Sequence, residues 1–292
     1  MKISGVSFVR NALKLSYPII ESLTSLIPVC DEVIVAVGNS DDGTLEAVRG
    51  LSPKIRVIET IWDDAKREGG RILAEQTNIA LNEAVGDWCL YLQADEVLHE
   101  DDLEKIKPEM IKAENRDIEA LIFRYRHFYG SYDYIGTGRQ WYRREIRAFK
   151  NTGKVVSWGD AQGFKKRVGN DFEKLRARQT ELRIFHYGWV RPPKAQQLKQ
   201  QAFQRLYHDD TWMAENVLKQ DEFDYDSAFE LEFFKGTHPR VMHDRIEKDR
   251  EWTQRFDQKR LKKKPLLVKL TDGIEKRTGW RIGEYKNFTE VK

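Results

Sequence analysis

The sequence predicts an α/β fold in which the first hundred residues form a doubly wound, mostly parallel sheet. Near-continuous apolar runs of strand length recur at 3–9, 32–37, 55–59 and 88–92, as expected for strands that are covered on both faces. Apolar residues at helical spacing fill the segments between these runs. Strands that alternate with helices form parallel sheets with right-handed crossovers. A change of pattern after Glu96 indicates a different architecture for the rest of the chain.

The first two predicted strands each end in a polar segment. Strand 3–9 is followed by Arg10 and by a helix that Pro18 is expected to kink or restart. Strand 32–37 ends in the turn 38–44, whose side chains and free amides can face a ligand. An ordinary turn that caps the following helix explains the same residues equally well.

The fourth predicted strand ends in two adjacent acids. The third strand, 55–59, leads through a polar loop into an amphipathic helix that ends at Gly86. The run that begins at Trp88 then stops at Asp95 and Glu96. In open α/β sheets, ligands bind beyond the carboxyl ends of the strands, so these acids are placed to hold a cation against an anionic substrate. The alternative is the start of a helix, whose positive end attracts acidic side chains.

The second half of the chain shows a mixed pattern. The elements predicted there are a helix at about 101–114 and strands at 121–128 and 145–149. Between these strands, segment 129–144 is rich in aromatic, Gly and Arg residues and too polar to be core throughout, which predicts a loop that lines a site. Pro192 and Pro193 mark a boundary. Beyond them we expect helices, including a long charged helix at 240–264.

Composition limits the classes of function. The 292 residues suffice for one large domain with an appendage, and 50 basic against 47 acidic residues give a net charge of +3, which does not point to nucleic acid. Cys30 and Cys89 lie in or beside apolar stretches, which indicates reduced thiols and a cytosolic protein. The sequence shows neither a signal peptide nor the roughly 18 continuous apolar residues of a membrane span. We therefore expect a soluble protein, and surface attachment to a membrane remains open.

Several stretches of the first hundred residues follow one another at a specific spacing, namely 9–11, 31–44, 78–88 and 90–95. Together they resemble the family 2 glycosyltransferases of the GT-A fold. The turn 38–44 parallels the Gly-Ser-x-Asp-Gly-Thr turn of that family, and 90–95 parallels the strand that presents its DxD motif. The resemblance covers roughly residues 3–190, and the combined spacing is far more specific than any single stretch.

The resemblance implies a GT-A fold, a Rossmann-like mixed sheet flanked by helices. Residues 1–191 would form the glycosyltransferase domain, with a nucleotide-binding half at about 1–98 and an acceptor half at about 99–191. Residues 192–292 would form a helical C-terminal extension. The implied activity is the metal-dependent, inverting transfer of a sugar from a nucleotide-diphosphate sugar to a hydroxyl acceptor. A saccharide or lipid-linked acceptor in cell-surface polysaccharide or glycoconjugate synthesis, at the inner face of the membrane, would fit such an enzyme.

The resemblance also implies roles for single residues. Asp95 would ligate Mn²⁺ or Mg²⁺, hard cations that prefer oxygen ligands, and His186 would complete the metal shell. Asp160, in a Gly-flanked loop, would be the general base. The residues expected to bind the donor are Arg10, Asn39, Asp41, Asn78, Gln93, Asp95 and Arg144. From the residues alone, His186 can equally be a packed, hydrogen-bonded histidine, and Asp160 can be a structural acid that pairs with Lys165 or Lys166.

The chain departs from the family pattern at informative points. Gln93 replaces the first acid of the DxD motif, and Val37 or Gly38 replaces the Asp that commonly precedes the turn. Thr77 stands where a basic residue often precedes the Asn. Gln93 and Thr77 favour one alternative function, a nucleotide-sugar-binding scaffold that has lost catalysis. A nucleotidyltransferase is a second alternative, although the segment after the first strand is a poor version of its phosphate loop.

Other side chains support further hypotheses. Glu96 is expected to hold a metal-coordinating water or to cap the next helix. Phosphate could be clamped by the guanidinium groups of Arg139, Arg143, Arg144 and Arg147. Trp141 and Trp158 would stack on acceptor sugar or lie in the core. The basic run 259–264 would contact anionic lipid or end a helix in solvent. The sequence is also compatible with a homo-oligomer.

Overall fold

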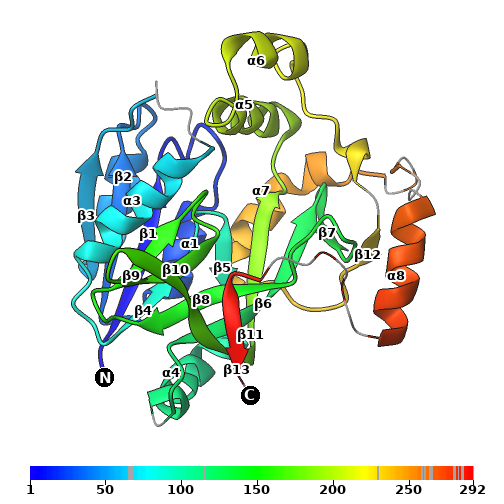
Figure 1. Cartoon of the computed structure of the whole chain (residues 1–292). Coiled ribbons are helices and arrows are strands. Elements are labelled where there is room, and N and C mark those ends of the chain that lie inside the picture. Colours follow the sequence, from blue (N-terminus) through cyan, green and yellow to red (C-terminus); the bar gives the residue numbers. More distant parts are fainter. Residues whose placement is uncertain are drawn as a thin grey trace.

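In the computed structural model the chain forms one mixed sheet with helices on both faces (Figure 1). The structure describes residues 1–64, 69–114, 116–228, 230–257, 259, 261–262, 266–278, 281, 283 and 286–291. Early strands make a parallel half of the sheet, and later strands add an antiparallel and mixed half. The predicted α/β class, with a mixed sheet flanked by helices, is confirmed.

The amino-terminal half of the sheet is parallel, as the apolar runs predicted. Its strands are β1 (Ile3–Val9), β2 (Glu32–Gly38), β3 (Ile55–Thr60) and β4 (Trp88–Tyr91). They lie side by side in the order β3, β2, β1, β4. β1 pairs in parallel with β2 and with β4, and β2 pairs in parallel with β3. Their carboxyl ends therefore meet at one edge, where ligands bind in open α/β sheets.

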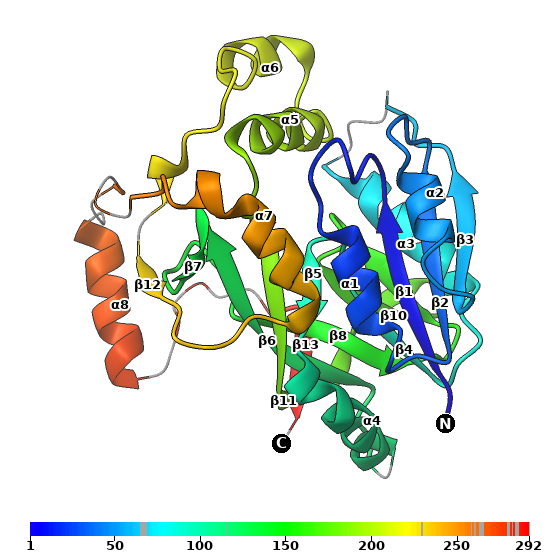
Figure 2. The ribbon, with the colours of Figure 1, turned by 180° about the vertical axis from the view of Figure 1, so that it is seen from behind.

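Helices cover both faces of this half, because alternate residues of each buried strand point to opposite faces. One face packs against α1 (Ile19–Leu26), α2 (Thr44–Arg49) and α4 (Glu100–Glu114). The other face packs against α3 (Arg71–Asn82). In Figure 2 α1 and α4 lie in front of the strands. Cys30 and Cys89 are buried free thiols, as predicted. They lie in the hydrophobic clusters on opposite faces of the sheet.

The second half of the sheet continues from β4. Its strands are β5 (Glu96–Leu98), β6 (Ala120–Tyr129), β8 (Arg144–Lys150), β9 (Val155–Trp158), β10 (Gly163–Val168) and β11 (Asp171–Trp189). β8 runs antiparallel between β4 and β6, and the long β11 runs parallel to β6. β11 also pairs antiparallel with β5 and β10, so its last residues reach the edge at which β4 ends.

Residues after 191 are mostly helical but also extend the sheet. The helices are α5 (Pro193–Gln204), α6 (Asp210–Asn216), η1 (Tyr225–Ser227), η2 (Arg240–Met242), α7 (His243–Thr253) and α8 (Leu266–Thr278). Strand β12 (Leu231–Phe233) pairs with β7 (Ser131–Gly136), and β13 (Phe288–Val291) pairs with β11. The division into a domain and an extension stays a prediction.

Two local predictions are wrong. The predicted helix 240–264 ends at Thr253, the last residue of α7. Segment 129–144, predicted as a loop, contains β7, which pairs with β6 in a tight hairpin around Gly130. The aromatic residues that made this segment look like a loop pack instead against the C-terminal segment, for example Tyr129 against Tyr225.

Candidate active site

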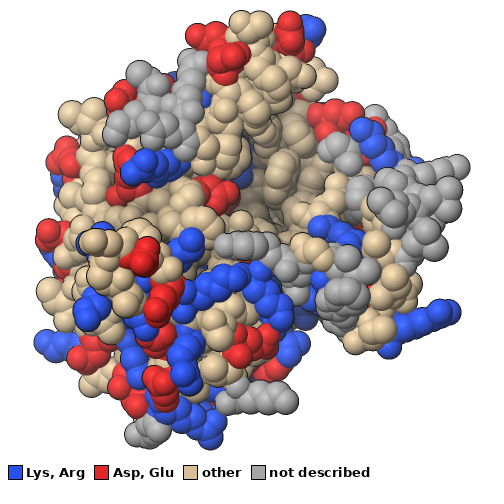
Figure 3. All heavy atoms as spheres, viewed as in Figure 1, with Lys and Arg blue, Asp and Glu red and all other residues tan. Residues whose placement is uncertain are grey.

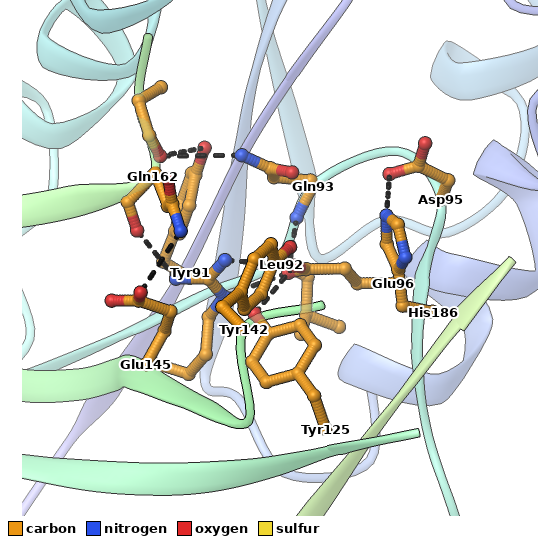
Figure 4. Close-up of polar contacts among 12 residues, drawn as sticks. Tyr91, Leu92, Gln93, Asp95, Glu96, Tyr125, Tyr142, Glu145, Gln162 and His186 are labelled. Carbon is orange, nitrogen blue, oxygen red and sulfur yellow. Dashed lines mark hydrogen bonds and ion pairs between the residues drawn. The ribbon is translucent and has the colours of Figure 1, made fainter. Parts of the chain in front are cut away.

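The turn between β4 and β5 carries Asp95. β5 pairs with β11 so that Glu96 lies opposite His186. This register brings Asp95, the residue before Glu96, beside His186, and Asp95 Oδ1 lies 3.7 Å from His186 Nε2 (Figure 4). Both residues are buried, with 5% and 7% of their surface exposed. The structure thus brings together the two predicted metal ligands.

A chain of hydrogen bonds determines which nitrogen of His186 carries its proton. His127 Nε2 lies 2.7 Å from the carbonyl oxygen of Tyr142, and a carbonyl oxygen only accepts, so His127 donates here. The neutral His127 ring then accepts at Nδ1 from His186 Nδ1, 2.9 Å away. His186 Nε2 therefore has a lone pair, which faces Asp95. Burial lowers the pKa of His186 to about 4 although the Asp95 carboxylate opposes the shift, so the ring is neutral at pH 7.

Two cations lie at the other oxygen of the Asp95 carboxylate. Lys199 Nζ, from α5, donates to Asp95 Oδ2 over 3.2 Å, and Arg191 Nη2 lies 3.6 Å from the same oxygen. Burial raises the pKa of Asp95, but the positive charges of Lys199 and Arg191, the nearby His186 ring and the hydrogen bond from Lys199 outweigh it and hold this pKa well below its usual range. Burial and the nearby Arg191 lower the pKa of Lys199 to about 8. Asp95 and Lys199 are therefore both charged at neutral pH.

Asp95 and His186 fit a divalent cation. A carboxylate oxygen and an unprotonated imidazole nitrogen are metal ligands, and both groups are in the ionisation state that ligation needs. Gly188 keeps space beside them, because a Cβ there would come within 2.6 Å of His186 Nε2 and 2.9 Å of Asp95 Oδ2. Within the described residues, no third His, Cys, Asp or Glu joins the pair.

Gln93 connects the turn after β4 to the loop that carries Asp160. Its side-chain amide donates to the carbonyl oxygen of Ala161 over 3.3 Å, and the Tyr91 hydroxyl donates to the same oxygen over 3.4 Å. Ala161 is fully buried and has a φ of +64°, in the left-handed region that residues with a Cβ rarely adopt. The side chain at position 93 therefore holds the loop in a strained backbone conformation.

Asp160 lies in this loop between β9 and β10. The Tyr207 hydroxyl approaches Asp160 Oδ2 to 3.5 Å, and the backbone of Gly70 lies against the same side chain. The alternative pairing with a neighbouring lysine is wrong, because both lysines have other partners. Lys166 Nζ lies 2.6 Å from the Glu119 carboxylate, and Lys165 Nζ lies over the Trp158 ring, 3.6 Å from its centre.

The predicted donor-binding residues of the first two strands lie near one another at the carboxyl ends of β1 and β2. Arg10 pairs with Asp64, with a 3.0 Å contact from Nη2 to Oδ2, and its guanidinium lies 5.6 Å from the centre of the Trp62 ring. Asn39 Oδ1 accepts from the backbone amide of Trp62 over 3.1 Å. Asp41 is exposed on the turn before α2. These side chains form one polar rim beside the β4 edge.

Two other predicted donor contacts have protein partners. Asn78 of α3 donates to the carbonyl oxygen of Ser157 and accepts from its amide, over 3.0 and 2.8 Å, so it fastens β9 to α3. Arg144 Nη1 pairs with Glu290 of β13 over 2.8 Å and with Gln179 over 3.1 Å. Neither contact involves Asp95, and a role of Asn78 or Arg144 in donor binding stays a prediction.

The prediction for Glu96 is wrong, and so is the phosphate clamp at Arg147. Both side chains are completely buried, and Arg147 Nε and Nη2 donate to the two oxygens of Glu96 over 2.9 and 2.8 Å. The Tyr125 hydroxyl and the backbone N–H of Gln93 also donate to the Glu96 carboxylate, over 2.6 and 3.0 Å. Glu96 is thus the centre of a buried ion pair beneath the site (Figure 4).

Two neighbouring cavities share residues of the segment after β7, and one of them is lined by His186. One of about 340 Å³ is lined by His127, Tyr129, Gln140, Trp141, Tyr142, His186, Trp189 and Ala228. The other, of about 390 Å³, shares Gln140, Trp141 and Tyr142 with it and also contacts Glu145 and Gln162. Trp141, predicted to face an acceptor or the core, lines both. Figure 3 shows a hollow below the uppermost part of the molecule, with Lys and Arg side chains gathered beneath the hollow.

Sequence reasoning missed Arg191, Lys199 and His127. Arg191 and Lys199 lie beyond the resemblance, and no motif marks them, since a lysine in a charged helix is ordinary. His127 lies in β6 directly opposite His186 in the parallel register, which only the strand pairing reveals. Glycine at 188, two residues after His186, was the one local sign that the backbone must leave room there.

The basic run 259–264 lies partly outside the described residues, because only 259, 261 and 262 are described. A contact of this run with anionic lipid therefore stays a prediction. Among the described residues, no helix combines the length and the apolar character that crossing a bilayer requires.

Comparison with solved structures finds similarity to S. aureus TarS. The crystal structure of TarS 1-349 in complex with UDP is 20% identical over 44% of this chain and 36% of that chain, with a TM-score of 0.35. The structure of TarS is 13% identical over 76% of this chain and 41% of that chain, with a TM-score of 0.41. The structure of TarS 1-349 in complex with UDP-GlcNAc is 14% identical over 76% of this chain and 68% of that chain, with a TM-score of 0.41. In the first two, the match spans less than two thirds of the TarS chain.

A family comparison gives the clearer result. No curated protein matches the chain. The sequence model described as glycosyl transferase family 2 matches residues 9–172, more than half of the chain, and this range includes Asp95 and Asp160. His186, Arg191 and Lys199 lie beyond it. The chain therefore belongs to glycosyl transferase family 2, as the spacing of its first hundred residues predicted.

Proposed function

We propose that this protein is an inverting, metal-dependent glycosyltransferase that moves a sugar from a nucleotide-diphosphate sugar to a hydroxyl acceptor. The observation that carries the proposal is the buried pair of Asp95 and His186, 3.7 Å apart and in the ionisation states that bind a metal. A divalent cation at this pair, Mn²⁺ or Mg²⁺, would supply positive charge to the diphosphate of the donor.

Asp160 is the proposed general base. In the reaction, the bond between the anomeric carbon and the β-phosphate oxygen breaks, and its electron pair stays on the nucleoside diphosphate. The acceptor oxygen bonds to the anomeric carbon from the opposite face, which inverts the configuration, and its proton passes to Asp160. An ionised carboxylate can take this proton as the sugar bond breaks, since the alcohol becomes acidic only at that stage.

The nucleotide end of the donor would lie along the rim of Arg10, Asn39 and Asp41. These side chains lie at the carboxyl ends of β1 and β2, the edge at which α/β sheets bind nucleotides. Arg10 would contribute positive charge, and Asn39 and Asp41 would offer hydrogen bonds to a base or ribose. UDP and UDP-GlcNAc, the ligands named for the TarS structures, are the first donor probes to test.

The acceptor would enter through the aromatic cavity beside His186. Ring faces such as Trp141 and Trp189 suit the apolar faces of sugar rings. We propose a saccharide or lipid-linked acceptor, and a role in cell-surface polysaccharide or glycoconjugate synthesis. Transfer of a sugar to such an acceptor would take place in the cytoplasm, at or near the inner face of the membrane.

Calorimetry with a panel of nucleotide sugars tests the proposal, with and without Mn²⁺. Wild type should bind one donor with an affinity that rises on addition of Mn²⁺, and it should release the nucleoside diphosphate. Asp95→Ala should abolish both effects. Turnover in Asp95→Ala equal to wild type would overturn the proposal. Tight, metal-enhanced binding without release of nucleoside diphosphate, for any acceptor extract, would instead favour the scaffold alternative that Gln93 and Thr77 suggested.

A further inference from the structure

Two cations beside Asp95, Arg191 and Lys199, belong to the turn before α5 and to α5 itself. Both residues lie beyond residues 9–172, the range that the family model matches. Arg191 precedes the Pro192 and Pro193 pair that starts α5, and Lys199 lies in its second turn. Both side chains reach Asp95 Oδ2, at 3.6 and 3.2 Å. Two positive charges on one carboxylate leave an excess of positive charge in a buried place, which favours the binding of an anion.

Two hydrogen-bond donors of Arg191, Nε and Nη2, have no acceptor at hydrogen-bond distance among the described residues, although Nη2 forms the 3.6 Å ion pair with Asp95. The residue is completely buried, and its guanidinium lies 4.4 Å from the centre of the Tyr17 ring. Nη1 donates to the carbonyl oxygen of Leu15 over 3.3 Å, whereas Nε and Nη2 make no hydrogen bond to the described residues. Buried donors without acceptors cost free energy, so they indicate a ligand that accepts from them. The fork formed by Nε and Nη2 matches two oxygens of a phosphate.

Lys199 is held in place but keeps bonding capacity. Its ammonium donates to Asp95 Oδ2 and, over 2.8 Å, to the carbonyl oxygen of Gly188. An ammonium has three donors, so one remains for a ligand. The flexible stem of a lysine also allows the group to shift from the carboxylate toward an arriving anion.

We propose that Arg191 and Lys199 bind the diphosphate of the donor, so that α5 completes the active site. This inference rests on the proposed function, since it names the partner of the phosphate oxygens in the same site. The leaving group is the nucleoside diphosphate. The two cations hold its diphosphate beside Asp95 and offset the negative charge that develops on the β-phosphate oxygen. Family members without α5 at this place would lack this contribution.

Binding of inorganic pyrophosphate tests the inference, because pyrophosphate carries the diphosphate without base or sugar. Isothermal titration in excess EDTA removes any contribution of a divalent cation. Wild type should bind pyrophosphate, and Lys199→Met should weaken binding at least tenfold. Arg191→Lys, which keeps the charge but loses the fork, should weaken it several-fold. Lys194→Met, on the exposed side of the same helix, is the matched control and should bind as wild type does.

Circular dichroism of each variant separates lost binding from lost folding, and Lys199→Arg should restore binding if Lys199→Met is unstable. Equal affinity of folded Lys199→Met and wild type, or no binding by wild type, would overturn the inference. Its failure is distinct from that of the proposed function. If Lys199→Met loses pyrophosphate binding but wild type turns over no nucleotide sugar, only the proposed function is wrong. If turnover depends on Asp95 but Lys199→Met binds pyrophosphate as wild type does, only the inference is wrong.

Discussion

Gln93 donates its side-chain hydrogen bond to Ala161, across 3.3 Å, and so connects the end of β4 to the loop of the proposed base. In the DxD motif that the sequence resembles, an acid at this position helps to seat the nucleotide. Here the side-chain amide supports the backbone of the neighbouring loop, and a carboxylate could not, because it has no proton to donate to a carbonyl. A contact of Gln93 with the donor stays a prediction. The departure at Gln93 is thus coupled to the unusual φ of Ala161.

Replacing Gln93 with Ala should therefore affect catalysis more than donor binding. We expect kcat to fall about tenfold, because a loop that loses a hydrogen bond holds Asp160 less well. The donor Kd should change less than threefold. Gln93→Glu is the matched control, since it keeps the size of the side chain and loses the donor, and it should follow Gln93→Ala. A large loss of donor affinity at unchanged kcat would show that Gln93 contacts the nucleotide.

Asp160→Asn should lower kcat by about 10²-fold to 10⁴-fold, the usual contribution of a general base, and leave the donor Kd unchanged. Steady-state kinetics together with donor titration measure both quantities. Tyr207→Phe removes the 3.5 Å contact to Asp160 and should cost less than tenfold in kcat. Turnover by Asp160→Asn at the wild-type rate would exclude this residue as the base.

Glu96→Gln should destabilise the fold by about 3–5 kcal/mol, the cost of leaving one member of a buried ion pair unpaired. The destabilisation comes from Arg147, which is completely buried. Its other hydrogen bonds go to the carbonyl oxygens of Ile146 and Gln162, so none of them is to a second carboxylate. Urea unfolding measures the change in the free energy of unfolding. The double variant Glu96→Gln, Arg147→Met should lose less than the two single variants together. Full additivity would contradict the pairing.

Glu145 should make stability depend on pH. Burial raises the pKa of its carboxyl from 4.5 to about 7, although Arg147 and hydrogen bonds from Asn287 and Gln162 oppose the shift. The native state therefore holds this proton more tightly than the unfolded chain. The resulting stabilisation is complete below about pH 4.5 and is lost as the pH rises through about 7, up to roughly 3 kcal/mol.

Glu145→Gln removes this titration. Urea unfolding of wild type and variant between pH 5 and 8 should show that wild-type stability falls relative to the variant as the pH rises. A difference between the two proteins that stays constant across this range would contradict the raised pKa of Glu145.

Gly188→Ala should weaken Mn²⁺-dependent donor binding at least tenfold, and overpacking of this buried place should lower the free energy of unfolding by about 1–3 kcal/mol. The added methyl group would collide with His186 and Asp95, at 2.6 and 2.9 Å. Gly273→Ala is the matched control, because it makes the same substitution where the added Cβ would meet no atom within 4 Å. This variant should bind the donor as wild type does. Unchanged metal-dependent binding in Gly188→Ala would mean that the cation lies elsewhere.

Local sequence patterns determined the first half of the fold. The apolar runs of β1, β2 and β4 and the turn before α2 follow from the composition of consecutive residues, and parallel pairing follows from their alternation with helices. The position of Asp95 at a strand end was predictable for the same reason. The pattern failed at β7, where Tyr134 packs against Phe233, almost a hundred residues later in the chain.

The tertiary structure alone decided which groups surround Asp95. The antiparallel register of β5 and β11 brings His186 to it, and α5 adds Lys199. It also decided that Glu96, the neighbouring acid, turns inward to Arg147. The physical reason is that ion pairs and metal ligands depend on distances in space between residues remote in the chain, whereas sequence periodicity records only which face of its own element each residue occupies.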